Sequence, residues 1–129
     1  MANTVQARKQ KGRRLQQYVA KEILKLFPEL TERDVRSTPM GVTGEDVQLS
    51  EKASALFPYS VECKNKESLS IWAELKQCEQ DSRDLTPLLV FHRNNSKTYC
   101  SMEFEYFMKL LEEMEALKDY KYRYESCSK

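Results

Sequence analysis

Two apolar stretches on either side of an amphipathic helix constrain the fold more than any other feature. Residues 58–65, "PYSVECKN", and residues 86–94, "TPLLVFHRN", have the β-branched and aromatic content of strands. Residues 68–84 lie between them and have helical periodicity, with Trp72 expected on the core face. A strand, a helix and a second strand in this order predict a right-handed crossover within a mixed sheet. The chain is therefore expected to be an α/β protein.

Helices are predicted at both ends of the sequence. Residues 11–27 have apolar side chains three and four residues apart, and Pro28 ends this helix. Residues 103–118 predict a last helix whose broad apolar stripe we expect to pack on the sheet and on a second subunit. The stripe consists of Phe104, Phe107, Met108, Leu110, Leu111 and Met114.

Short extended segments fill the remaining positions. Residues 34–38 and 41–49 predict two strands, and residues 96–102 predict the hairpin partner of the strand before them. Residues 50–57 fit either a helical turn or a hairpin excursion, and residues 119–129 fit either an edge strand or a frayed tail. The predicted order is α-β-β-β-α-β-β-α, a mixed central sheet flanked by helices.

The composition is typical of a single soluble domain covering residues 1–129, with residues 1–10 as a basic N-terminal arm. Hydrophobic residues make up 40% and charged residues 32% of the chain. No apolar run approaches the roughly 20 residues that span a bilayer, and the first residues lack the apolar region of a secretory signal. We therefore expect a cytoplasmic protein without a membrane segment.

The cysteines argue against a zinc site or a disulfide framework. The chain has four cysteines and one histidine, and no two cysteines form a CxxC pair. We expect reduced thiols, with Cys63 and Cys100 packing as small apolar side chains. His92 is interpreted as a residue at the end of a strand.

Three charged residues suggest a metal site. Alternate residues of a strand share a face, so Glu62 and Lys64 point to one side of the strand at residues 58–65 and Cys63 to the other. Asp46 precedes a neighbouring short strand and could converge with them. Two carboxylates suit Mg²⁺, which takes oxygen ligands and keeps several waters, and an adjacent lysine can orient the attacking water.

The residues alone also allow a simpler interpretation, in which Glu62 and Lys64 belong to a cross-strand salt bridge on a solvated sheet face. The E-x-K pattern recurs at residues 74–76 and 119–121. The first copy lies on a predicted helix, where residues i and i+2 diverge, and the second lacks an apolar strand and an upstream carboxylate. Only the copy at residues 62–64 has the context of a site.

Several short motifs together resemble a known superfamily. They are, in order, "KGRRLQQYV", "GEDV", "VECKN", "WAELKQCEQ" and "TPLLVFHRN". Their order, spacing and predicted elements resemble the PD-(D/E)XK nucleases, with a restriction-endonuclease-like core. Within that superfamily they look like the Holliday junction resolvases of archaea and their small phage-encoded relatives. The resemblance covers about residues 11–102.

This resemblance implies roles for individual residues. Asp46, Glu62 and the carbonyl of Cys63 would bind Mg²⁺, for which Mn²⁺ would substitute, and Lys64 would be the catalytic lysine. Gln77 matches a position where many phage members carry a glutamine near the site.

The chain departs from the family pattern at two positions. Gln16 stands where the first helix usually offers a glutamate, and either Gln16 or the nearby Glu22 could serve in its place. Glu45 replaces the proline of the "PD" motif, and a register slip of one residue would make Glu45 the ligand instead of Asp46.

The resemblance also implies a DNA substrate. A basic segment would approach the DNA backbone, where each cation neutralises a phosphate; it contains Arg8, Lys9, Lys11, Arg13 and Arg14. We expect a Mg²⁺-dependent, structure-selective endonuclease of a phage-infected or bacterial cell, acting on branched DNA as a homodimeric Holliday junction resolvase. The alternatives are a general or nicking endonuclease of the same superfamily and an inactive nucleic-acid-binding protein that keeps the fold.

Overall fold

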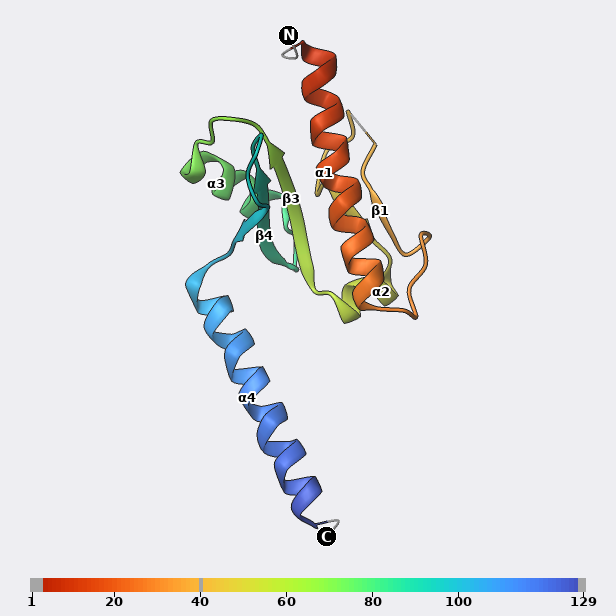
Figure 1. Ribbon diagram of the computed structural model, residues 1–129, viewed down its shortest axis with the longest axis vertical. Coiled ribbons are helices and arrows are strands. Elements are labelled where there is room, and N and C mark those ends of the chain that lie inside the picture. Colours follow the sequence, from red (N-terminus) through yellow and green to blue (C-terminus); the bar gives the residue numbers. More distant parts are fainter. Residues whose placement is uncertain (1–3, 40, 128–129) are drawn as a thin grey trace.

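The computed structural model describes residues 4–39 and 41–127, except for the side chains of residues 126 and 127 (Figure 1). It is an α/β protein with a mixed three-stranded sheet and an antiparallel two-stranded sheet, flanked by helices. Its elements are α1 (Val5–Leu26), β1 (Val35–Ser37), β2 (Val47–Leu49), α2 (Glu51–Leu56), β3 (Tyr59–Asn65), α3 (Ile71–Asp81), β4 (Thr86–His92), β5 (Tyr99–Ser101) and α4 (Phe104–Cys127).

The crossover predicted from the sequence forms the centre of the molecule. β3 and β4 are parallel, with Glu62 opposite Leu89, and α3 connects them. β5 pairs antiparallel with β4 and makes the sheet mixed. Val61 and Cys63 of β3 pack with Val90 and the apolar stripe of α1 in the main core. α3 covers the opposite face, where the Cys78 thiol contacts the Ser60 carbonyl.

A hairpin of β1 and β2 attaches to the free edge of β3. β1 and β2 are antiparallel, and Val35 and Val47 from the two strands are almost fully buried. The Asp46 N–H, one residue before β2, donates to the Val61 carbonyl at 2.9 Å. This bond fixes the start of β2 against the middle of β3.

α1 is longer than the sequence predicted, and α2 decides between two predicted alternatives. α1 begins at Val5, where the Thr4 hydroxyl accepts a hydrogen bond from the Ala7 N–H. Residues 5–10 are therefore helical and do not form a separate arm. Residues 51–56 form a helix, because Ser50 caps it by accepting from the Ala53 N–H. This resolves the ambiguity of residues 50–57.

The last helix differs most from expectation. α4 continues to Cys127, so residues 119–127 form neither an edge strand nor a frayed tail, while residues 128 and 129 lie outside the described part of the chain. The expectation that α4 packs on its own sheet is wrong, because α4 projects away from the core and its apolar side chains are exposed (Figure 1). No described helix is long and apolar enough to cross a membrane.

Two smaller packing expectations are also wrong. Trp72 is 82% exposed, because α3 turns Glu74 and Cys78 to the sheet and leaves Trp72 on the opposite side. Cys100 is exposed on the short strand β5, whereas Cys63 is buried as expected. Cys63 and Cys78 are free thiols.

Candidate active site

β3 and α3 together bury the charged face of β3. Glu62 is only 4% exposed. The Lys64 ammonium nitrogen lies 3.8 Å from Glu62 Oε1 and 3.3 Å from Glu74 Oε2 on α3. Glu62 and Lys64 therefore do form an ion pair, as the simpler interpretation expected, but they lie on one strand and α3 covers their face, so the expectation of a cross-strand pair on a solvated face is wrong.

Asp46 reaches the same strand from the hairpin. Besides its backbone bond to Val61, its carboxylate Oδ2 accepts a 2.6 Å hydrogen bond from the Cys63 N–H. The carbonyl of Glu45 accepts instead from the Thr38 hydroxyl. In this register Asp46, and not Glu45, holds its carboxylate against β3.

The two carboxylates are held where ionisation is unfavourable. The pKa of Glu62 is raised to about 7, first by burial and then by the nearby charge of Asp46, whose effect is larger than the opposing effect of Lys64. Burial also raises the pKa of Asp46, despite the hydrogen bond from Cys63. Within residues 4–39 and 41–127, the buried Glu62 Oε2 atom has no hydrogen-bond partner. When both Asp46 and Glu62 are ionised, the surrounding protein groups therefore compensate only part of their negative charge.

The chemistry of these groups fits a hard cation. Among the described residues, no cluster of three or more His, Cys, Asp or Glu side chains forms a metal site. The candidate ligands are thus two carboxylates, Asp46 and Glu62, and a backbone oxygen. Because the N–H and C=O of a strand residue point to the same edge, the Cys63 carbonyl faces the Asp46 edge of β3. Mg²⁺ suits such a partial oxygen set, since it usually keeps several waters.

Gln16 and Glu22 occupy very different surroundings. α1 runs antiparallel to β3 (Figure 1), and the Lys11 carbonyl accepts from the Asn65 side chain at 2.9 Å. Counted from this contact, Gln16 lies five residues further along α1, a rise of about 7.5 Å, and Cys63 lies two residues back along β3, about 6.6 Å. Because the two elements are antiparallel, Gln16 lies level with Cys63. Gln16 is buried, and its Oε1 has no hydrogen-bond partner in the described structure. Glu22 is exposed and pairs with Lys25, so Gln16 is the better-placed candidate.

Glu74 was missed by the sequence analysis. It is buried and joins Lys64 to Lys66, whose ammonium lies 2.7 Å from Glu74 Oε1. Burial raises its pKa, but the Lys66 hydrogen bond and the charge of Lys64 outweigh burial and leave it below the usual value. Glu74 shares the buried face of α3 with Cys78, and this periodicity was the signal that could have identified it.

Two further α3 residues lie on the same side as Glu74. Gln77 is three positions after Glu74 but is exposed, so the structure does not bring it into the buried group. Asp81 is half-buried, and its charge raises the pKa of both Asp46 and Glu62.

The predicted DNA-contacting residues lie along the first turns of α1. Arg8, Lys9, Arg13 and Arg14 are exposed, while Lys11 is half-buried. Lys11 and Arg14 line a cleft of about 330 Å³ that also includes Asn65 and His92. His92 ends β4, as expected, and its Nδ1 lies 3.1 Å from the Asn65 side-chain oxygen.

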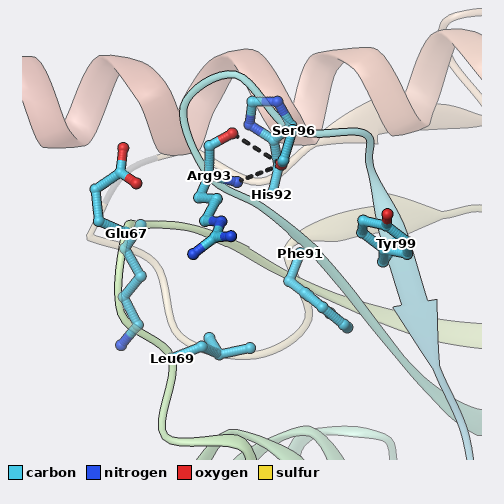
Figure 2. A pocket seen from close by; sticks show the side chains of 8 residues that line it. Glu67, Leu69, Phe91, His92, Arg93, Ser96 and Tyr99 are labelled. Carbon is cyan, nitrogen blue, oxygen red and sulfur yellow. Dashed lines mark hydrogen bonds between the residues drawn. The ribbon is translucent and has the colours of Figure 1, made fainter.

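A second pocket of about 330 Å³ is also lined by His92 (Figure 2). Figure 2 shows Phe91 and Tyr99 on neighbouring strands and Arg93 at the rim, and the two aromatic rings are stacked with centroids 6.1 Å apart. Lys66 lines this pocket and also binds Glu74. Glu74 therefore connects the buried charges to a cationic, aromatic surface.

Comparison with known proteins supports the superfamily. A family model described as "Phage putative PDDEXK endonuclease" matches residues 7–128, almost the whole chain. No curated protein and no solved structure matches the chain. The match includes every element that carries the candidate site, from α1 to α3. The chain therefore belongs to this phage family of PD-(D/E)XK endonucleases.

Proposed function

We propose that the protein is a Mg²⁺-dependent, structure-selective DNA endonuclease whose active site contains Asp46, Glu62 and Lys64. One observation carries the proposal: two carboxylates with raised pKa values lie beside a lysine, and one buried oxygen of Glu62 is unpaired among the described residues. A bound cation would balance this charge. The family match supports an endonuclease activity.

The chain's own residues have distinct roles in this proposal. Asp46, Glu62 and the Cys63 carbonyl hold the ion, and Asp46 is itself fixed by the Cys63 N–H. Bound Mg²⁺ supplies a Lewis acid that neutralises phosphate charge and favours in-line attack by water. Mn²⁺, which also accepts oxygen ligands, is expected to replace it.

Lys64 acts at the phosphate. Its ammonium donates to a phosphate oxygen or to the attacking water, and so stabilises the charge that develops as the phosphodiester bond breaks. Glu74 is a positioning residue, since it holds Lys64 at 3.3 Å and Lys66 at 2.7 Å. Gln16, level with Cys63, is proposed to orient water near the site, and Gln77 to line its outer edge.

DNA would lie along the start of α1. Arg8, Lys9, Arg13 and Arg14 present an exposed cationic surface, with Lys11 at the cleft beside β3. Such contacts position the DNA backbone without reading its sequence. Branched DNA is the proposed substrate because the motif order resembles that of Holliday junction resolvases. Activity is placed in the cytoplasm of a phage-infected or bacterial cell.

The test is cleavage of a labelled four-way DNA junction beside duplex and single-stranded controls, in Mg²⁺ and in EDTA. We compare the wild type with Glu62→Gln and Lys64→Ala. Lys76→Ala is the matched control, because Lys76 belongs to the E-x-K copy on α3 and is exposed. Symmetric paired nicks are expected with Mg²⁺ in the wild type and in Lys76→Ala only.

Other outcomes separate the alternatives. Equal cutting of plain duplex would leave the nuclease assignment standing and remove junction selectivity. Tight junction binding without cutting in any metal would instead identify an inactive binding protein. Cutting that survives both Glu62→Gln and Lys64→Ala would show that the reaction occurs at another site.

A further inference from the structure

α4 presents an extensive apolar surface that the rest of the described chain, residues 4–39 and 41–103, does not cover. The helix begins at Phe104, shortly after β5, and extends away from the core (Figure 1). Its first fourteen residues carry apolar side chains at three- and four-residue spacing, all of them exposed. We call these residues the α4 stripe: Phe104, Phe107, Met108, Leu110, Leu111, Met114 and Leu117.

The size of the α4 stripe indicates that it is covered in solution. Its members are between 37% and 72% exposed. For side chains of this size the exposed apolar area is on the order of 700 Å², above the roughly 300–600 Å² of the largest patch on a typical monomer. It is close to the area of about 800 Å² that each partner contributes to a standard protein interface.

We propose that α4 pairs with α4 of a second copy of this chain in antiparallel orientation. The α4 stripe runs from Phe104 to Leu117 and is centred between Leu110 and Leu111. An antiparallel pair about this centre sets Phe104 opposite Leu117 and Phe107 opposite Met114, so each large side chain meets another. Self-pairing of one surface in this way is the geometry of a twofold dimer.

The charge along α4 favours a second copy as the occupant. Residues 103–115 contain five glutamates and one lysine, whereas residues 116–125 contain three basic and two acidic residues. Antiparallel pairing brings Lys118 opposite Glu103 of the other copy. Within the described part of α4, Lys118 pairs with Glu115 of its own helix at 3.2 Å, and both side chains are exposed. It can therefore turn to a new partner at little cost.

A parallel pair is less favourable for two reasons. It would set the acidic segment around Glu112, Glu113 and Glu115 against itself, which costs energy in a helix pair. It would also place both globular cores at the same end of the paired helices, because each core lies at the N-terminal end of its α4 (Figure 1). Antiparallel pairing places the cores at opposite ends.

The inference does not depend on the proposed nuclease function, and its test uses neither DNA nor metal. The mass of the full chain is measured by sedimentation equilibrium at micromolar concentrations for the wild type, Leu111→Glu and Ala116→Glu. Ala116 lies on the side of α4 away from the α4 stripe, so its variant adds the same charge elsewhere. Since α4 makes no part of the core, both variants are expected to fold, which circular dichroism verifies.

We expect a dimer for the wild type and Ala116→Glu, and a monomer for Leu111→Glu. The dimer contains two copies of position 111, so the dissociation constant should rise at least about 100-fold. A monomeric wild type would overturn the proposal. A dimer that Leu111→Glu leaves intact would also overturn it, because another surface would then form the interface.

Cross-linking tests the orientation. Phe104→Cys and Leu117→Cys are prepared separately, each with Cys100→Ser and Cys127→Ser, then mixed and treated with a short thiol-reactive cross-linker. Antiparallel pairing predicts the mixed 104–117 product. Cross-links that join only 104 to 104 and 117 to 117 would show a parallel pair and contradict the proposed orientation.

Discussion

β3 and α4 depart from the ordinary rules of burial in opposite directions. On β3, a carboxylate at position 62 is 4% exposed, whereas on α4 the apolar side chain of Phe104 is 72% exposed. Charges are normally solvated and large apolar groups normally buried, because the opposite arrangement costs free energy. Each exception suggests a missing component: a cation for the carboxylates and a second copy of the chain for the helix.

The two regions differ in how far neighbouring residues offset the cost of the unusual exposure or burial. Glu62 has Lys64 and α3 around it, so the chain tolerates the buried charge while raising its pKa. Among the described residues, α4 has no such surroundings, and none of them covers the α4 stripe. Loss of the cation should therefore alter the chemistry at β3, whereas loss of the second copy should alter assembly and leave the core folded.

The largest effect is expected from Glu62→Gln, which should separate activity from stability. Mg²⁺-dependent cleavage should fall on the order of 10²–10³-fold, since a charged ligand is lost. The metal-free protein should unfold at the same or a higher temperature at pH 8, because a buried charge is removed. Cleavage assays and thermal unfolding measure the two. Glu79→Gln, an exposed glutamate of α3, is the control and should change neither.

The pH dependence of stability should show the same buried charge. With the pKa of Glu62 raised from 4.5 to about 7, the native state binds more protons than the unfolded state between these pH values. Stability of the metal-free protein should then fall as pH rises from about 5 to about 8, by up to ~3 kcal/mol. Thermal unfolding measures this fall.

Two comparisons make this pH prediction specific. Glu62→Gln should flatten the profile, and Mg²⁺ should stabilise the wild type more at pH 8 than at pH 5, because the ion binds the ionised carboxylates. A metal-free protein that is equally stable at pH 5 and pH 8 would show that Glu62 does not hold an uncompensated charge.

Leu111→Glu should lower the proportion of junctions that are cut on both strands, while the rate of the first nick stays unchanged. If the two copies act together on one junction, the second cut benefits from a high effective concentration. Breaking the dimer should reduce paired cuts within one binding event by about tenfold, while the first nick at saturating enzyme stays near the wild-type rate. A cruciform plasmid assay that separates nicked from linear products measures the ratio. An unchanged ratio would mean that monomers make both cuts.

The sequence predicted the parts of the molecule that depend on local pattern. The crossover of β3, α3 and β4 followed from periodicity, and alternation along β3 placed Glu62 and Lys64 on one face. The motif resemblance identified the superfamily that the family match supports. In the first two cases the pattern of neighbouring residues determines the structure, so no knowledge of distant contacts was needed.

Other features depend on packing that the sequence does not encode locally. Glu74 was rejected because residues i and i+2 diverge on a helix, yet the partner of Glu74 is Lys64 on β3 and not Lys76. Trp72 was expected in the core because it is apolar, but the rotation of α3 about its axis turns Cys78 inward instead. α4 has an ordinary core-facing pattern, and such a pattern does not say which chain the helix packs against.

The smallest effect is expected from the basic surface of α1. Unlike the buried Glu62 of β3 and the exposed α4 stripe, this surface follows the ordinary rule of burial, because it is charged and exposed. Arg13→Ala and Arg14→Ala should each weaken junction binding a few-fold and lower the slope of log affinity against log salt by about 0.9, if each contacts one phosphate. Lys25→Ala, near the far end of α1 and paired with Glu22, is the control and should change neither quantity. Fluorescence anisotropy over a salt series measures both.

If all three variants lose affinity equally, α1 contributes only net charge and not a defined DNA contact. A loss restricted to positions 13 and 14 would place the DNA backbone along the part of α1 that adjoins Asn65, at the end of the strand that carries Glu62.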